Sequence, residues 1–119
     1  LNIIELNLYY NELTDISGIK LFKNLKRLYL SYNKLTDLSV LKDLKNLKTL
    51  WIANNKITDI SVLKYLKELR FSDIRYLLLE SNQIKYINSC KNLKTLYCRE
   101  GFKDMNILNQ LNKNIKTYK

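Results

Sequence analysis

Hydrophobic and polar residues alternate along this chain in a compound pattern that recurs several times. In residues 47–66 the apolar positions are Leu47, Leu50, Ile52, Ile57, Ile60, Leu63 and Leu66. The alternation around Trp51 predicts a short strand, because neighbouring strand residues point to opposite faces. The three-residue spacing from Ile57 onward predicts a tight helical or turn-like return. Each unit therefore joins one strand to one return segment.

The unit recurs with a constant period in the first part of the chain. Copies begin at Ile3, Leu25 and Leu47, each 22 residues after the last, and read L-x-x-L-x-L-x-x-N-x-L with Leu or Ile at L. This pattern resembles the leucine-rich repeat family over essentially the whole chain. The segments NKLTDLSVL and NKITDISVL are similar to the 22-residue class of bacterial internalins and of a nuclear regulator of protein phosphatase. The resemblance implies an α/β right-handed solenoid, with a parallel concave sheet and a helical or irregular convex side.

The phase of the pattern changes in the second half of the chain. Ser72 stands where a repeat starting at Leu69 would need leucine, so we expect the fourth repeat to begin at Ile74. The third repeat would then hold five additional residues, and residues 61–70 would form the longest helix. We interpret the chain as one domain, residues 1–119, with about five strands and repeats starting near residues 3, 25, 47, 74 and 93, plus a partial repeat from 115.

Polar residues recur at fixed places in the repeat. We expect the side chains of Asn11, Asn33, Asn55 and Asn82 to bond the backbone of buried loops, because an amide offers both donors and acceptors. The loss of one such side chain should cost about 1–3 kcal/mol. Recurrent Asp and Ser residues predict turn and capping interactions, with Asp59 or Ser61 as an N-cap. The D-x-D-x-D-G spacing of a calcium loop does not occur, so no calcium site is predicted.

Catalytic residues are scarce in this composition. The chain has no histidine and only two glycines, and neither a phosphate-binding loop nor a G-x-S-x-G sequence is present. Cys90 and Cys98 fall on core positions, where we expect free, buried thiols typical of a reducing compartment. No apolar run approaches the length needed to cross a membrane, and no targeting segment is recognised. We therefore predict a protein without enzymatic activity, cofactor or metal site; the compartment is left open, and these features favour the cytoplasm.

The strand residues that face away from the core are the candidate functional residues. The predicted central column reads Asn7, Tyr29, Trp51, Leu78 and Tyr97. Aromatic and arginine side chains are enriched at the centres of interfaces, although packing between neighbouring strands is the alternative explanation. We predict a partner-binding surface with a solvent-facing Trp51 at its centre. Its members are Tyr29, Trp51, Tyr76 and Tyr97, with Arg27 and Arg99 as charged anchors and Tyr9, Tyr32 and Glu80 around them.

The net charge of +10 and the isoelectric point near 9.6 favour acidic partners. The lysines are distributed over the repeat, which favours a role in solubility; one column reads Lys26, Lys48, Arg75, Lys94 and Lys116. The predicted function is protein–protein interaction, as an adaptor, a receptor fragment or an inhibitor. The alternative is a nucleic-acid-binding module that uses the basic surface and the concave aromatic residues. We expect a monomer, or a dimer that pairs through the strand edge near residues 4–8.

Overall fold

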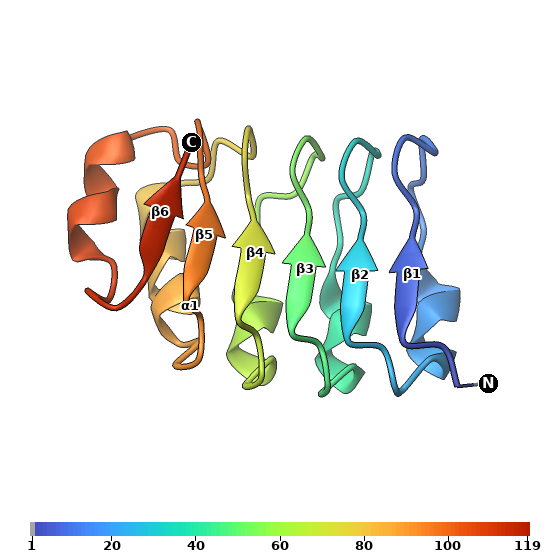
Figure 1. Ribbon diagram of the computed structural model, residues 1–119. Helices are drawn as coiled ribbons and strands as arrows, with labels where there is room; N and C mark the ends of the chain where they lie inside the picture. The colour runs from blue at the N-terminus through green and yellow to red at the C-terminus, as the bar shows by residue number, and fades with distance from the viewer. Residues whose placement is uncertain (1) are drawn as a thin grey trace.

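The computed structural model describes residues 2–119 and contains a parallel sheet of six short strands (Figure 1). Each strand pairs with the next strand along the chain, so the sheet order follows the sequence. The strands are β1 (Glu5–Asn7), β2 (Arg27–Tyr29), β3 (Thr49–Trp51), β4 (Phe71–Asp73), β5 (Thr95–Tyr97) and β6 (Lys116–Tyr118). The predicted parallel sheet is confirmed, with six strands instead of about five.

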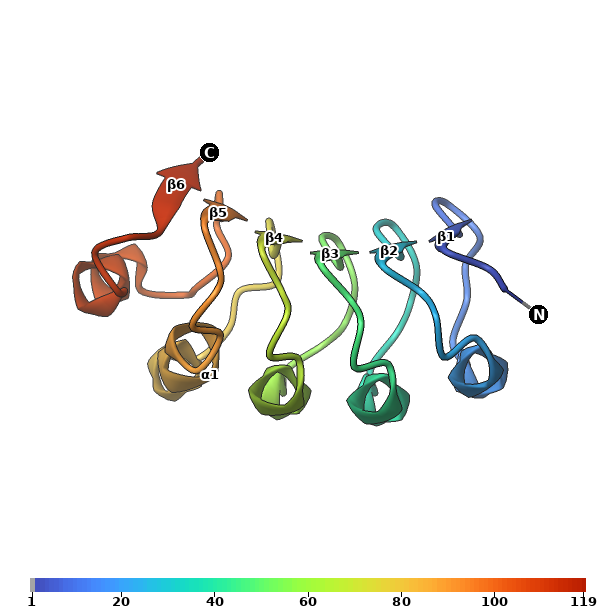
Figure 2. The ribbon, with the colours of Figure 1, turned by 60° about the horizontal axis from the view of Figure 1, so that its bottom comes forward.

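Short helices return the chain from the end of one strand to the start of the next, because parallel strands need a crossover connection. Figure 2 shows these helices as a row on the convex side, with the strands lining the concave side. The helices are the 3-10 helices η1 (Ser17–Leu21), η2 (Ser39–Asp43), η3 (Ser61–Tyr65), η4 (Ser81–Gln83) and η5 (Met105–Gln110), and the α-helix α1 (Ile84–Asn88). The repeating strand and return give the predicted solenoid.

The core lies between the sheet and the row of helices. Leu25, Leu47 and Leu69 begin successive repeats and are fully buried, and so are the inward strand residues Leu28 and Leu50. Complete burial of a leucine side chain contributes roughly 1.5–3 kcal/mol. Stacking of the repeats thus stabilises each one, because a single repeat has no second layer against which to bury its leucines.

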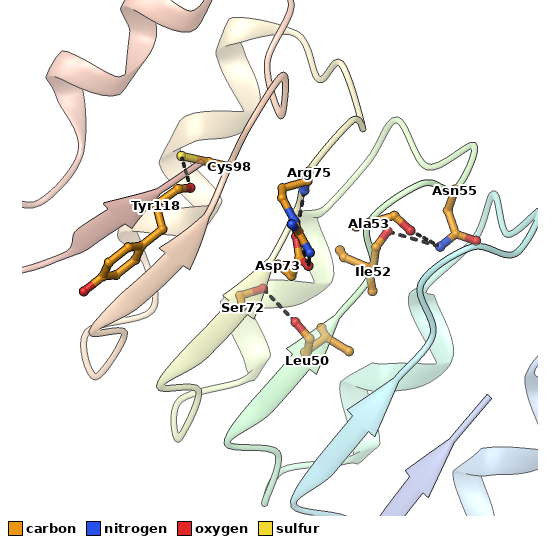
Figure 3. A network of polar contacts seen from close by, with 9 residues as sticks. All are labelled: Leu50, Ile52, Ala53, Asn55, Ser72, Asp73, Arg75, Cys98 and Tyr118. Atoms are coloured by element: carbon orange, nitrogen blue, oxygen red, sulfur yellow. Dashed lines mark hydrogen bonds and ion pairs between the residues drawn. The ribbon is translucent and has the colours of Figure 1, made fainter. Parts of the chain in front are cut away.

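The fourth repeat begins at Leu69, so the predicted start at Ile74 is wrong. β4 occupies Phe71–Asp73, in register with β3, and keeps the 22-residue phase. Ser72 takes the place of the expected leucine: it is fully buried, and its hydroxyl donates a hydrogen bond to the carbonyl oxygen of Leu50 at 3.0 Å (Figure 3). A satisfied hydroxyl costs little in a core, which is why serine is tolerated here.

The apolar run that suggested a later strand lies in the loop after β4. Leu77 and Leu79 are buried there, and Leu79 forms an isolated parallel bridge with Phe102. Because the chain keeps its phase through β4, the third repeat has no spare residues for a long helix. The predicted helix over residues 61–70 is therefore wrong, since η3 ends at Tyr65 and is as long as η1 and η2.

Two of the predicted asparagines bond the loop backbone as expected. The side-chain nitrogen of Asn33 donates to the carbonyl oxygens of Leu8 and Leu30, at 2.8 and 2.9 Å. Asn55 donates in the same way to Leu30, at 3.0 Å, and to Ile52, at 3.1 Å. Figure 3 shows the bond to Ile52. These bonds satisfy carbonyl groups that have no sheet partner.

The other asparagines depart from this pattern. Asn11 is exposed and donates only to the carbonyl oxygen of Tyr9, and Asn82 is exposed in η4, so its predicted place in the series is wrong. The equivalent positions are Leu77 and Gly101. Their own backbone N–H groups donate to the carbonyl oxygens three residues earlier, at 3.3 and 2.8 Å. A tighter turn of the main chain thus replaces the amide side chain.

Asp15, Asp37 and Asp59 have the turn role that their recurrence predicts. Each carboxylate accepts a hydrogen bond from the backbone N–H two residues later, at 2.8, 2.7 and 2.8 Å. These bonds order the chain where it enters η1, η2 and η3. Burial plays almost no part, since all three aspartates are exposed. The hydrogen bonds to Ser17 and Ser39 lower the pKa of Asp15 and Asp37.

Candidate concave binding surface

The strands present two columns of side chains on the concave side of the sheet. The first and third residues of each strand face away from the core, because strand residues alternate between the two faces. The register places Glu5, Arg27, Thr49, Phe71, Thr95 and Lys116 in the first column. The second column is Asn7, Tyr29, Trp51, Asp73, Tyr97 and Tyr118. We call these two columns the concave face.

Aromatic rings gather at two places on the concave face. Trp51 packs edge-on against Tyr29, with 4.9 Å between ring centres, and Tyr9 reaches over from the loop after β1 to within 6.2 Å of Trp51. At the other end Tyr97 and Tyr118 lie 5.4 Å apart. Between the two clusters is an open groove of about 380 Å³. Its lining consists of Tyr29, Thr49, Trp51, Phe71, Thr95, Tyr97 and Tyr118.

The rings around the groove are exposed to different degrees. Phe71 and Tyr118 are 43% and 46% exposed, large fractions for side chains of this size. Trp51 is only partly exposed, and its indole N–H is buried without an acceptor among residues 2–119. The expectation of a fully solvent-facing Trp51 is therefore met only in part, because Tyr9 and Tyr29 cover the ring. Burial also raises the pKa of the Tyr9 and Tyr29 hydroxyls.

Two arginines on or beside the concave face are already paired within the chain. Arg27 contacts Glu5 at 2.7 Å, and this hydrogen bond raises the pKa of its guanidinium. Arg75 donates hydrogen bonds from two of its nitrogens to the carboxylate of Asp73, with an Nη2–Oδ2 distance of 2.8 Å (Figure 3). Asp73 is only 2% exposed. The bond to Asp73 likewise raises the pKa of Arg75. The guanidinium carbon of Arg75 also lies 5.7 Å from the ring centre of Tyr97, within cation–π range.

The structure brings part of the predicted set together. Tyr29, Trp51 and Tyr97 share one column, and Arg27 lies in the neighbouring column. Tyr9 stacks on the ring of Tyr29. Arg99 is exposed just beyond β5. Leu78 does not belong to the column, since Asp73 occupies that place.

Three predicted residues lie elsewhere. Tyr32 and Tyr76 belong with Tyr10 to the loops that follow the strands, where all three have left-handed backbone angles of φ 56–65°. Tyr10 and Tyr32 stack with ring centres 4.4 Å apart, which gives these loops an aromatic surface of their own. Glu80 lies after β4 and forms an ion pair with Lys103. Left-handed angles are unusual for bulky residues, so the stacked loops constrain the chain to them.

Four residues of this surface were not predicted: Phe71, Asp73, Arg75 and Tyr118. A strict 22-residue phase would have placed Phe71 and Asp73 in the two columns, beside Thr49 and Trp51. The apolar run at residues 77–79 hid that signal. Tyr118 needed a sixth complete strand, which the polar sequence of β6 does not suggest.

Both cysteines are free and buried, as predicted. The Cys90 thiol lies 3.5 Å from the carbonyl oxygen of Leu63, and burial raises its pKa to about 11. Burial also raises the pKa of Cys98. Within residues 2–119 no cluster of three or more His, Cys, Asp or Glu side chains is arranged to hold a metal ion. In the same range, every helix is too short or too polar to cross a bilayer.

Comparison with solved structures places this geometry among known proteins. An internalin, inlF, from Listeria monocytogenes superposes with a TM-score of 0.86 at 28% identity, over 97% of this chain and 34% of that protein. Internalin C2 from the same species gives 0.79 at 28% identity, over 98% and 51% of the two chains. A leucine-rich-repeat protein of Leptospira interrogans gives 0.70 at 25% identity, over 98% and 37%. The chain therefore spans about one third to one half of these proteins.

Sequence comparison gives the same family. No curated protein sequence matches the chain. The family model described as leucine-rich repeats, in two copies, matches residues 1–43 and again residues 23–65, which together cover more than half of the chain. The chain thus belongs to the leucine-rich-repeat family, whose fold generally mediates protein–protein interaction and is typically a non-enzymatic binding scaffold.

Proposed function

We propose that this chain binds a protein partner through its concave face. The observation that carries the proposal is the groove between the two aromatic clusters, with Trp51 on one side and Tyr97 and Tyr118 on the other. Aromatic side chains bury a large area at little conformational cost, so they dominate the binding energy of many interfaces. Phe71 lies between the clusters and is available for contact. In this role the chain acts as an adaptor, a receptor fragment or an inhibitor that covers a surface of its partner.

The charges around the groove favour a protein over a nucleic acid at this place. Arg27 and Arg75 are each paired with a carboxylate, that of Glu5 and that of Asp73, which offsets their positive charge and weakens their attraction for phosphates. Arg99 and Lys116 supply positive charge at the β5–β6 end. A partner that carries acidic residues beside an apolar patch would match this arrangement. The net charge of +10 would speed its association at low ionic strength.

The test begins with co-purification from the native cell and identification of the bound protein by mass spectrometry. Affinity for that protein is then measured for the parent chain, for Trp51→Ala and for Lys42→Glu on the convex side. We expect Trp51→Ala to weaken binding by about 2–4 kcal/mol, since truncation of a central aromatic residue has costs of this order. Lys42→Glu should change little except the salt dependence of the association rate.

Two results would contradict the proposal. One is a Trp51→Ala variant that binds as tightly as the parent while Lys42→Glu loses affinity, which would move the site to the convex side. The other is retention of the parent on nucleic acid that Trp51→Ala abolishes and salt weakens steeply. That result would favour nucleic-acid binding by the concave aromatic residues.

A further inference from the structure

The turns that lead into β2 to β6 share a basic four-residue pattern. Residues 23–26, 45–48 and 91–94 read Lys-Asn-Leu-Lys, residues 67–70 read Lys-Glu-Leu-Arg, and residues 113–116 read Lys-Asn-Ile-Lys. In each segment the third residue is buried in the core, which holds the cations on both sides of it in place. In Figure 1 these turns lie side by side along the edge of the sheet where the strands begin. We call the exposed side of these five segments the basic edge.

The basic edge carries two parallel columns of positive charge. The outer column is Lys23, Lys45, Lys67, Lys91 and Lys113. The inner column is Lys26, Lys48, Arg70, Lys94 and Lys116, with Arg70 in the place that the sequence pattern had given to Arg75. The two columns hold ten of the 21 Lys and Arg residues of the chain. All ten are exposed except Lys48, which is partly exposed. The basic residues are therefore concentrated, and not simply spread for solubility.

Backbone hydrogen bonds fix the spacing of these charges. The N–H of Lys48 donates to the carbonyl oxygen of Lys26, and that of Arg70 to Lys48, at 2.8 and 2.9 Å; Lys94 and Lys116 continue the series. Neighbours in the inner column are thus one strand spacing apart, about 4.8 Å. The turns of the outer column are linked as well, since the Asn92 side chain donates to the carbonyl oxygen of Lys67 at 2.9 Å.

None of these ten cations forms an ion pair within residues 2–119. The four ion pairs of residues 2–119 involve Arg27, Lys34, Arg75 and Lys103, none of which belongs to the basic edge. Glu68 is the single acidic residue in the five segments. Like charges in register on adjacent strands repel each other. The repeat keeps this arrangement five times despite its cost, which points to an anionic ligand.

We propose that the basic edge binds the phosphate backbone of duplex DNA without reading its sequence. Four strand spacings give an edge about 20 Å long, so its ten cations amount to about one per 2 Å. Duplex DNA carries about one charge per 1.7 Å of its axis, a comparable density. An extended acidic peptide reaches at most one charge per roughly 3.3 Å, which is a poorer match.

The side chains of the basic edge agree with backbone binding alone. Nine of its ten cations are lysines, which contact phosphate as point charges. The five segments contain no aromatic residue on which an unpaired base could stack, so a single strand gains no stacking energy from this surface. Binding here uses side chains other than those of the aromatic groove, with Lys116 as the one residue common to both surfaces. The proposal therefore stands without the proposed protein partner.

The experiment uses the intact chain and a fluorescently labelled DNA duplex of about 25 base pairs and arbitrary sequence, with affinity measured by anisotropy at several salt concentrations. The test variant is Lys45→Gln/Lys67→Gln/Lys91→Gln on the basic edge. Its control is Lys34→Gln/Lys56→Gln/Lys103→Gln, three exposed lysines on loops that follow the strands, with the same change in net charge. A second test variant, Lys26→Gln/Lys48→Gln/Lys94→Gln, neutralises three of the five cations of the inner column. Thermal unfolding of each variant verifies that it is folded.

The parent should bind duplex DNA with a log–log salt slope of about −3 to −5, as expected for a few phosphate contacts. Each test variant should lose at least about tenfold in affinity and lower the slope by about 2–3, while the control stays within about twofold of the parent. Equal losses in test and control variants would overturn the proposal, because net charge alone would then explain binding. So would polyglutamate or phosphatidylserine vesicles bound as tightly as DNA, which would point to an acidic protein or a membrane surface. Undetectable binding of the parent to DNA would overturn it too.

Discussion

The concave face spans all six strands and the basic edge follows the turns before β2 to β6, yet positive charges have opposite surroundings on these two neighbouring surfaces. On and beside the concave face, Arg27 and Arg75 are each paired with a carboxylate, and aromatic rings separate the pairs. On the basic edge ten cations are aligned without an ion-pair partner among residues 2–119, and the five segments contain no aromatic residue. The first surface is suited to apolar contact, the second to an extended anion.

The difference shows that position within the repeat, and not composition, decides what each basic residue does. In a solenoid every residue is stacked beside its equivalent in the next repeat, so a side chain kept at one position becomes a continuous column. The basic edge consists of the residues two places before and one place after the leucine or isoleucine that begins a repeat. Residues two and four places after it form the concave face. Two surfaces of different chemistry can therefore be built from one short repeat.

The largest expected effect on stability distinguishes residues of the core from residues of the two surfaces. Leu50 is fully buried, whereas its neighbour Trp51 faces the groove. Leu50→Ala should lower the free energy of unfolding by about 2–5 kcal/mol, since it leaves a cavity in a packed core. Trp51→Ala should lower it by clearly less, because Trp51 is partly exposed and packs against Tyr9 and Tyr29 on the surface of the sheet. Urea unfolding of both variants measures the difference, and equal losses would show that Trp51 is a core residue and not a residue of the binding surface.

The sequence predicts the regular part of the fold because hydrophobic spacing determines it. Leu28 and Leu50 mark their strands in the first three repeats, and Asn33 and Asn55 mark the loops. The sequence pattern misplaces the fourth strand because Ser72 takes a core position. Its hydroxyl is satisfied there by a hydrogen bond to a backbone carbonyl, which the spacing of apolar residues does not reveal.

The candidate site is predictable to the same extent. Tyr29, Trp51 and Tyr97 follow from the pattern, since each occupies the same place in its repeat. Phe71 is missed together with the phase of β4. The partial burial of Trp51 could not be predicted, because it depends on the path of the loop that carries Tyr9 over the ring.

A smaller effect concerns the asparagines that shape the loops beside the concave face. The Asn55 side chain makes hydrogen bonds to the backbone of Leu30, Ile52 and Leu35, while that of Asn11 reaches only Tyr9 and is exposed. Asn55→Ala should therefore cost about 1–3 kcal/mol of stability, because buried carbonyl groups lose their partner. Asn11→Ala is the matched control, and its loss of stability should be only a small fraction of that of Asn55→Ala. Comparable losses in the two variants would contradict this account of the loops.

The pH dependence of the free energy of unfolding tests whether the Cys90 thiol is buried in the core. Burial raises the pKa of Cys90 from 9.0 to about 11, so the folded protein resists formation of the thiolate. The contribution of Cys90 to the free energy of unfolding is complete below about pH 9, where the unfolded thiol is protonated. It is lost as the pH rises toward 11. We expect Cys90 to account for a loss of about 1–2 kcal/mol between these pH values, somewhat below the full linkage value because the folded thiol itself begins to titrate near pH 11.

Cys90→Ala is the control for this measurement, since it removes the thiol but leaves every other titrating group in place. The difference between parent and variant, followed by urea unfolding from pH 8 to about 10.5, should therefore shrink as the pH rises. A constant difference would mean that Cys90 titrates normally and is open to solvent. Labelling of the native protein with a thiol reagent should agree, being slow until the protein is denatured.

The smallest expected effect compares the two surfaces directly through their charges. Lys94 stands between Arg70 and Lys116 on the basic edge, so Lys94→Gln relieves repulsion and should raise the free energy of unfolding by about 0.2–0.5 kcal/mol at low salt. Arg27→Gln on the concave face instead breaks the exposed pair with Glu5 and should lower the free energy of unfolding slightly. Both changes should fade near 1 M salt, where charges are screened beyond about 3 Å. Urea unfolding of both variants at low and high salt would reveal the opposite signs. If Lys94→Gln destabilises the protein at low salt, the cations of the basic edge do not repel each other and need no external anion.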